Sequence, residues 1–334
     1  MKKYFPILTL VLLFACAKEP GLVLETALVA IPKGFPELTF PADNELTSER
    51  WSLGKKLFFD PILSRDQSIS CASCHHPELG FTDGHRFSEG VEGRTGTRNA
   101  PSLANIGYHP YYTREGGVPT LEMQILVPIQ EHAEFDFNIL LIADRMQKDS
   151  NYVRASWAAY GRGPDPFVIT RAISSFERTI ISGDSRYDRF INGGNEQLSS
   201  SERQGRDLFF DDKLSCARCH AGFNFTNYAF ENNGLYKEYT DPGRFRLTGE
   251  EADRALFKVP SLRNVAITGP YMHDGSLATL REVVEHYNSG GKNHPHKSHL
   301  IKPLNLTETE KADLIAFLGT LTDHSFLTDE KFRN

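Results

Sequence analysis

The chain has 334 residues, 40% of them hydrophobic and 24% charged, the composition of an ordinary globular protein of roughly two domains. Its net charge is −6, from 37 basic and 43 acidic residues, and no basic block occurs anywhere. Composition and charge therefore exclude an intrinsically disordered chain and give no support to a nucleic-acid partner.

The first 15 residues are predicted to be a secretory signal. Lys2 and Lys3 precede an apolar run, residues 4–15, that is too short to span a bilayer. The run ends in Leu-Phe-Ala-Cys, which resembles a bacterial lipobox, so we expect Cys16 to be lipidated and to hold the protein to a membrane through lipid alone. A plain signal peptide with an incidental cysteine is the alternative. Residues 16–45 contain four prolines and are predicted to be a tether, with the mature protein in the periplasm.

The four other cysteines form two C-x-x-C-H motifs, the attachment signal of c-type haem. The first motif consists of Cys71, Cys74 and His75, and the second of Cys216, Cys219 and His220. Two thiols at this spacing reach the two vinyl groups of one porphyrin, and the adjacent histidine supplies an axial iron ligand. A zinc site would need the two cysteine pairs to converge, and a thioredoxin-like redox pair would need a βαβ context. The motifs predict two covalently bound haems c.

The surroundings of the two motifs repeat. Residues 54–60 before the first motif match residues 205–211 before the second, residues 80–83 match 224–227, and residues 101–105 match 260–264. Self-similarity at this long period indicates one haem-binding unit used twice. We therefore expect two tandem cytochrome c-like haem domains, residues 46–190 and 191–334.

The predicted secondary structure is mostly α, with long irregular loops. Capping boxes begin at Ser199, Thr279 and Thr307, and residues 167–181 have helical apolar spacing. Residues 76–120 and 221–275 are rich in glycine and proline and are expected to wrap the haems. Residues 182–201 are the expected link between domains.

Further segments resemble the bacterial dihaem cytochrome c peroxidase family, which includes the MauG enzymes. These are Arg98-Asn99-Ala100-Pro101-Ser102, residues 259–264 and residues 270–276, and the resemblance extends over about residues 45 to 321. It implies that the N-terminal haem reacts with peroxide and that the C-terminal haem receives and stores electrons.

The resemblance also implies a peroxide pocket with a Gln and a Glu ten residues apart, which Gln124 and Glu134 match. A pocket carboxylate can move the proton that cleavage of an O–O bond requires. The alternative for Glu134 is a solvated surface acid, and His132 is expected to be an ordinary loop histidine. Where many family members carry a loop His that ligates the N-terminal iron, this chain has Val91, so we expect an open haem; His85 could substitute if the loop differs.

At the C-terminal haem the resemblance places the distal ligand at Tyr287, with Met272 as the rival and core packing of the tyrosine as the alternative. The family's tryptophan between the haems is Arg114 here, which leaves the electron route open between Tyr111, Tyr112 and a haem propionate. A phenolate ligand lowers the haem potential relative to a thioether.

A structural calcium between the domains is implied by the resemblance, with the Asn99 side chain and the carbonyls of Thr268 and Pro270 as ligands. The histidines at 294, 296 and 299 are expected to lie in a solvated loop.

Three functions compete on this sequence. The favoured one is reduction of hydrogen peroxide to water, with electrons from a small cytochrome c or a cupredoxin. The second is MauG-like oxidation of a partner protein, and the third is electron transfer without chemistry. Gln124 and Glu134 argue against the third. The oligomeric state stays open, with a homodimer among the options.

Overall fold

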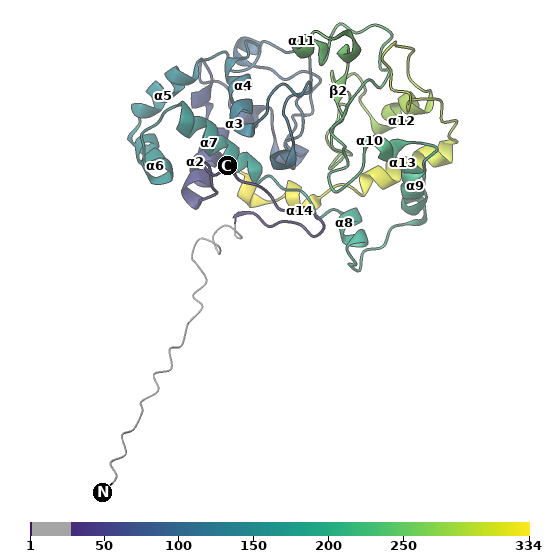
Figure 1. The fold of residues 1–334 in the computed structure, drawn as a ribbon, viewed down its shortest axis with the longest axis horizontal. Helices are drawn as coiled ribbons and strands as arrows, with labels where there is room; N and C mark the ends of the chain where they lie inside the picture. The colour runs from purple at the N-terminus through teal and green to yellow at the C-terminus, as the bar shows by residue number, and fades with distance from the viewer. Residues whose placement is uncertain (2–27) are drawn as a thin grey trace.

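The computed structural model describes Met1 and residues 28–334, which form two helical halves side by side (Figure 1). The predicted signal, Cys16 and the beginning of the predicted tether lie outside the described residues. Within the described part, no helix is both long enough and apolar enough to cross a membrane.

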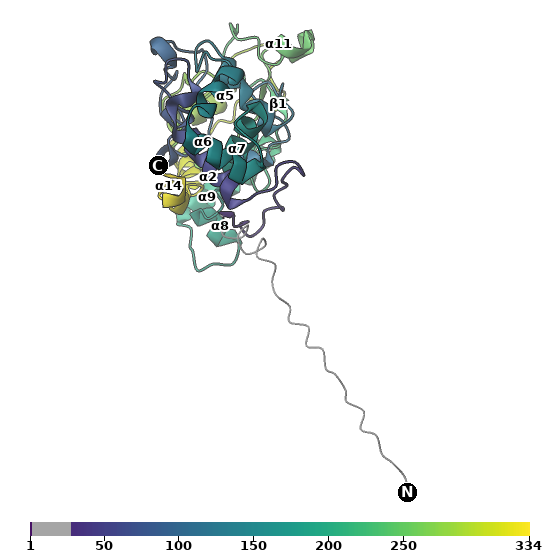
Figure 2. The ribbon, with the colours of Figure 1, turned by 90° about the vertical axis from the view of Figure 1, so that its left-hand side faces the viewer.

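Among the described residues, the N-terminal half has six complete α-helices and five 3-10 helices, and the view in Figure 2 looks onto α5, α6 and α7. The α-helices are α2 (Ser48–Phe59), α3 (Leu121–Gln124), α4 (Leu126–Gln130), α5 (Ile139–Gln147), α6 (Ser150–Tyr160) and α7 (Pro166–Arg178). The 3-10 helices are η1 (Pro61–Leu63), η2 (Cys71–Ser73), η3 (Pro77–Leu79), η4 (Val91–Gly93) and η5 (Ile106–Tyr108).

The C-terminal half is also helical, and its two short strands pair antiparallel. Its helices are α8 (Arg186–Ile191), α9 (Ser200–Phe210), α10 (Cys216–Cys219), α11 (Phe245–Thr248), η6 (Glu251–Asp253), α12 (Leu280–Asn288) and α13 (Glu308–Gly319). The strands are β1 (Phe230–Glu231) and β2 (Phe257–Lys258). Two short elements, α14 (His324–Leu327) and η7 (Glu330–Phe332), end the chain. The predicted mostly helical fold is confirmed.

All three predicted capping boxes begin a helix. The side chains of Ser199, Thr279 and Thr307 accept from the third backbone N–H of α9, α12 and α13, and the glutamate at that third position bonds back to the cap. The predicted helix over 167–181 is α7, whose apolar face is fully buried.

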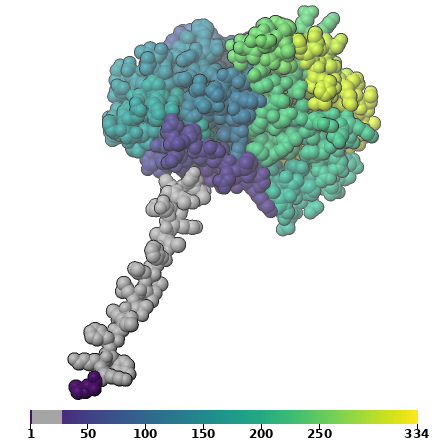
Figure 3. All heavy atoms as spheres, viewed as in Figure 1, coloured from purple at the N-terminus to yellow at the C-terminus, as the bar shows by residue number. Residues whose placement is uncertain are grey.

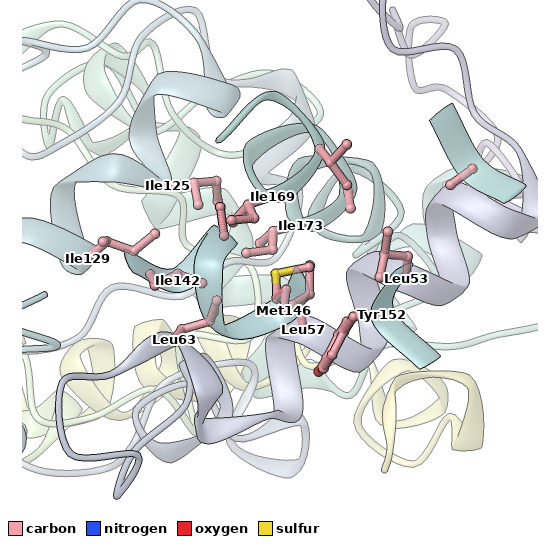
Figure 4. Close-up of a cluster of buried hydrophobic side chains, with 14 of the residues drawn as sticks. Leu53, Leu57, Leu63, Ile125, Ile129, Ile142, Met146, Tyr152, Ile169 and Ile173 are labelled. Atoms are coloured by element: carbon pink, nitrogen blue, oxygen red, sulfur yellow. The ribbon is translucent and has the colours of Figure 1, made fainter. Parts of the chain in front are cut away.

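In each half two helices cross at a glycine, so the sequence repeat is also a structural repeat. A Cβ atom on Gly54 of α2 would lie 1.8 Å from the carbonyl oxygen of Ala172 in α7. A Cβ atom on Gly205 of α9 would lie 1.8 Å from the carbonyl oxygen of Asp313 in α13. Only glycine permits such a close approach of backbones. Around the first crossing, Leu53, Leu57, Ile169 and other side chains point toward one another in a common core (Figure 4).

The ends of the halves differ from the predicted boundaries. Tyr187 of α8 packs in the core of the C-terminal half, so part of the predicted link belongs to that half. Phe326, Leu327 and Phe332 near the chain end pack in the N-terminal half, in a cluster with Phe58. The final residues follow the C-terminal half in sequence, but they lie in the N-terminal half because they bury the rings of Phe326 and Phe332 in its core.

The described part of the predicted tether is packed, which corrects its predicted extent. Asn44 is completely buried and bonds to Glu122, Ser174 and the carbonyl of Arg171. Further back, the Phe35 ring lies 5.9 Å from Tyr108 of the N-terminal half and 4.7 Å from Phe223 of the C-terminal half, measured between centroids. Figure 3 shows this segment, in purple, along the base of the molecule. Residues 29–45 therefore pack against both halves and are not a free tether.

Candidate functional site

Both C-x-x-C-H motifs hold their histidine in the same way. Nδ1 of His75 lies 2.8 Å from the carbonyl oxygen of Phe81, and Nδ1 of His220 lies 3.2 Å from that of Phe225. A carbonyl only accepts, so Nδ1 carries the hydrogen and Nε2 keeps its lone pair for a metal. The two phenylalanines occupy matching positions of the repeat, and both adopt positive φ angles, of 60° and 49°. The repeat therefore reproduces the histidine's orienting contact.

No disulfide joins the four cysteines of the motifs, and burial raises the pKa of each thiol. Because each motif lies in its own half, their cysteines do not converge. In the described part of the chain, no three His, Cys, Asp or Glu side chains gather where they could hold a metal ion. A zinc site would need the two cysteine pairs to converge, whereas a haem needs only one motif at a time.

Glu134 lies beside the first motif, in the loop between α4 and α5. Its carboxylate is close enough to raise the pKa of Cys71 and of Cys74. By surface area the Glu134 side chain is exposed, but the protein atoms packed around its carboxyl still desolvate it and raise its pKa to about 7, with repulsion from Glu131 adding to the shift. Glu134 is thus exposed as a surface acid would be, but its raised pKa lets it change protonation state near neutral pH.

The loop of Glu134 rests directly on Val91. The Val91 N–H donates to the Glu134 carbonyl oxygen at 3.0 Å, and the Val91 side chain is fully buried. A Cβ on Gly90 would lie 2.2 Å from the carbonyl oxygen of Ala133, so this contact requires glycine. His85, the possible substitute ligand, is exposed and its N–H bonds to Asp83.

Gln124 is the last residue of α3, and two contacts hold the beginning of this short helix. Thr120 caps its beginning, and Glu122 forms a two-pronged ion pair with Arg178 of α7, at 2.6 and 3.0 Å. Burial alone would raise the pKa of Glu122, but Arg178 outweighs it and lowers the value to about 2. Oε1 of Gln124 is buried and has no hydrogen-bond partner within the described protein. An unsatisfied buried acceptor of this kind suits a small hydrogen-bonding ligand.

His132 is a loop histidine, as expected. Its side chain is 74% exposed and bonds to Arg94 and Asp136 on the surface. The histidine-rich loop differs from the prediction of a solvated segment, because His294 is buried and accepts from the backbone N–H of His296.

Tyr287 and Met272 meet at a residue that the sequence did not single out, Asn233. Nδ2 of Asn233 donates to Sδ of Met272 at 3.1 Å. Burial raises the pKa of Tyr287 to about 12, a hydrogen bond from Asn233 opposes the rise, and the thiols of Cys219 and Cys216 add to it. Tyr287 therefore lies within electrostatic reach of the second motif, and Asn233 ties it to Met272.

Glu177 of α7 was also missed by the sequence analysis. It is buried, and desolvation raises its pKa to about 8 even though Arg178 opposes the shift. Its charge raises the pKa of Cys71 and of Tyr112, so it lies close to the first motif. In the sequence, the only sign of this buried carboxyl is that Glu177 interrupts the apolar pattern of α7.

Aromatic residues from two segments meet between the halves. Residues 108–112 supply Tyr108, His109, Tyr111 and Tyr112, and residues 223–230 lie just after the second motif. The ring centroid of His109 lies 6.3 Å from that of Tyr112 and 5.1 Å from that of Tyr228. Tyr112 belongs to the cluster that packs on Cys71.

The other end of this row of rings reaches the second motif through the backbone. Tyr228 follows Asn227, whose N–H bonds to the Cys219 carbonyl at 2.8 Å. Tyr112, His109 and Tyr228 therefore form one continuous row of rings between the two motifs.

For two of the three predicted calcium ligands, the side chain of Asn99 and the carbonyl of Pro270, the structure shows protein partners. Arg114 donates to the backbone oxygen of Asn99 at 2.9 Å and also to its side-chain Oδ1. Nδ2 of Asn99 donates to the Pro270 carbonyl at 2.7 Å. The side-chain oxygen of Asn99 and the carbonyl of Pro270 are thus both occupied by protein donors, an arrangement that does not fit a calcium ion.

Comparison with known proteins agrees with these features. A family model described as "Di-haem cytochrome c peroxidase" matches residues 48–196. The chain is 37% identical over 286 residues to the methylamine utilization protein MauG of Methylorubrum extorquens, covering 84% of this chain and 80% of that protein. It is 31% identical over 290 residues to cytochrome c551 peroxidase of Pseudomonas aeruginosa, covering 84% and 83%. A crystal structure of a MauG-like protein associated with microbial copper homeostasis superposes with a TM-score of 0.85 at 38% identity, over 90% of this chain and 97% of that one.

Proposed function

Because the chain belongs to the di-haem cytochrome c peroxidase and MauG family, we propose that it is a dihaem c-type peroxidase that reduces hydrogen peroxide to water. Its electrons come from a small redox protein, a cytochrome c or a cupredoxin, and enter at the C-terminal haem. The observation that carries the proposal is Glu134, a carboxyl beside the first motif whose pKa is raised to about 7.

Cys71, Cys74 and His75 hold the N-terminal haem in this proposal, and Cys216, Cys219 and His220 hold the C-terminal one. The fit rests on two features, the thiol pair at the porphyrin spacing and the ring Nε2 left free by the carbonyl at Nδ1. Haem c supplies the redox-active iron at which peroxide is reduced. The orienting carbonyls of Phe81 and Phe225 hold each histidine in one tautomer.

Glu134 moves the proton. Cleavage of the O–O bond requires that a proton leave one peroxide oxygen and reach the other, and a carboxyl with a pKa near the working pH does both steps well. Oε1 of Gln124 accepts the remaining O–H of the bound peroxide, which satisfies an otherwise unpaired buried acceptor. Val91 carries no group that can ligate iron, so a haem held by Cys71, Cys74 and His75 would receive no ligand from this loop.

Tyr287 is the distal ligand of the C-terminal haem in this proposal. Its interaction with both cysteines of the second motif supports Tyr287 over Met272. Oxygen ligation stabilises ferric iron, and this makes the C-terminal haem a better store of oxidising equivalents.

A second candidate is MauG-like oxidation of a partner protein. Val91 and Tyr287 favour it, as does the 37–38% identity to MauG and to a MauG-like protein. The two candidates share peroxide chemistry at the N-terminal haem and differ in the source of electrons. Stopped-flow turnover with a reduced cytochrome c or cupredoxin separates them: catalytic oxidation of two donors per peroxide supports the peroxidase, and its absence supports partner oxidation.

The proposal also includes a lipid anchor at Cys16 and a periplasmic location. A homodimer is the oligomeric state that it allows for. Labelling with a radioactive fatty acid, with Cys16→Ser as the control, tests the anchor.

The electron paramagnetic resonance spectrum of the fully oxidised holoprotein tests the haem assignments. One high-spin and one low-spin ferric signal are expected, the high-spin signal from the open site beside Val91. Two low-spin signals would contradict the open site and would favour a plain electron carrier or an enzyme that needs reductive activation.

A further inference from the structure

The contact between the two halves contains a buried cation that belongs to the protein itself. Arg114 lies in the loop between Tyr112 and β-bridged Val118 of the N-terminal half, and its guanidinium points at Asn99. Its backbone carbonyl accepts from the N–H of Lys258, in β2 of the C-terminal half, at 2.7 Å. Asn99 in turn donates to Pro270 of the C-terminal half. Arg114 and Asn99 therefore each touch both halves.

The orientation of the Asn99 amide follows from its two partners. A guanidinium has only donors, so the amide atom that faces Arg114 must be the oxygen. A carbonyl has only lone pairs, so the amide atom that faces Pro270 must be the nitrogen. A calcium ion needs the reverse, with the amide oxygen and the Pro270 carbonyl converging on the metal. The observed hydrogen bonds and a calcium ion on these two oxygens exclude each other.

The charges around Arg114 support the same conclusion. Although burial and the neighbouring Arg98 lower the pKa of Arg114 to about 10, the group remains a cation at neutral pH, helped by Glu115, Asp241 and Asp274. Arg98 forms ion pairs with Glu115 at 2.7 Å and with Asp241 at 2.6 Å, and Arg246 also pairs with Glu115 at 3.3 Å, so both carboxylates already have guanidinium partners. A divalent ion placed on Asn99 would meet the positive charge of Arg114 without a free carboxylate to offset it.

We propose that the guanidinium of Arg114 is itself the interdomain cation, binding both oxygens of Asn99, and that the protein binds no calcium at Asn99, Thr268 and Pro270. The cation that links the halves is then a side chain of the protein, and the link needs no metal ion.

The direct test is the metal content of the purified holoprotein. After incubation with 1 mM CaCl2 and dialysis against metal-free buffer, inductively coupled plasma mass spectrometry should find far less than one calcium per chain. The melting temperature should be unchanged by EGTA. About one calcium per chain, or a melting temperature that falls on chelation, would overturn the proposal.

Two variants test whether Arg114 supplies the cation. Arg114→Gln removes the charge and should lower the melting temperature by about 4 °C or more, the usual effect of losing charged hydrogen bonds in a chain of this size. Arg114→Lys keeps the charge and should lose less. Arg114→Gln that melts like the wild type in EGTA would also overturn the proposal, and a calcium-dependent rise in its melting temperature, absent from the wild type, would support it.

Discussion

The main-chain N–H of Val91 donates a 3.0 Å hydrogen bond to the carbonyl oxygen of Glu134. The bond joins the loop that lacks an iron-ligating histidine to the loop that carries the candidate acid–base group. Val91, at the position expected to lack an iron-ligating histidine, and Glu134, the candidate acid–base residue, therefore belong to one structural unit. Replacing either residue is therefore expected to affect the same site.

Glu134→Gln should lower peroxide turnover by roughly 10²–10⁴-fold, the usual contribution of a positioned acid–base group, while both haems stay attached. The base form is needed to take the peroxide proton, so wild-type turnover should rise with pH through about 7, the pKa of Glu134. The measurement is the pH dependence of steady-state peroxide reduction.

The matched control for that variant is Glu131→Gln. Glu131 repels the charged form of Glu134, so its neutralisation should move the midpoint of the pH profile downward and leave the maximal rate intact. An unchanged profile in Glu134→Gln would remove Glu134 from the mechanism.

Val91→His should close the open haem, because an imidazole at this position can ligate the iron from the loop that rests on Glu134. The oxidised variant should lose its high-spin signal in electron paramagnetic resonance and react slowly with peroxide until it is reduced. Val91→Leu, which adds bulk without a ligand, should keep the high-spin signal. A high-spin spectrum in Val91→His would show that this loop does not face the iron.

Tyr287→Phe should change the g-values of the low-spin haem and raise its reduction potential, since the phenolate stabilises the ferric state. Met272→Leu should leave the g-values unchanged, because Met272 is bonded to Asn233 and is not a ligand in the proposed arrangement. Potentiometric titration followed by electron paramagnetic resonance measures both. The opposite pattern would assign the iron to Met272.

His109→Leu should slow electron transfer between the haems severalfold, because it interrupts the row of rings formed by Tyr112, His109 and Tyr228. His109→Phe keeps a ring at this position and should keep the rate. The rate is measured by flash reduction of one haem and spectroscopic observation of the other, without peroxide. An unchanged rate in His109→Leu would show that this row of rings does not carry the electron.

The buried carboxyl of Glu177 should make the protein less stable as the pH rises. Its pKa is raised from 4.5 to about 8 by burial, so between these values the folded state holds a proton that the unfolded state has lost. The free energy of unfolding therefore falls with increasing pH in this window, by up to a few kcal/mol in order of magnitude. Urea unfolding between pH 5 and pH 8 should show this slope for the wild type and a flatter curve for Glu177→Gln. Equal slopes would mean that Glu177 is not protonated in the folded protein.

Local spacing determined much of this protein. Two C-x-x-C-H motifs specify haem attachment because both thiols and the histidine must meet one porphyrin within five residues. The capping boxes at Ser199, Thr279 and Thr307 begin helices where predicted because their bonds span only three residues. The apolar periodicity of residues 167–181 predicted α7 because helical spacing also repeats within a few residues.

Contacts between distant segments were decided only by the tertiary structure. Phe326, Leu327 and Phe332 return to the N-terminal core, and Asn233 comes to lie between Met272 and Tyr287. Asn99 is bonded to Arg114, 15 residues away, and to Pro270, 171 residues away, and this pair of partners orients its amide away from a metal. No local pattern encodes such pairings, because they depend on how the two halves pack. The sequence alone thus determined which cofactor the chain attaches, and the packing decided which side chains surround each motif and which cation joins the halves.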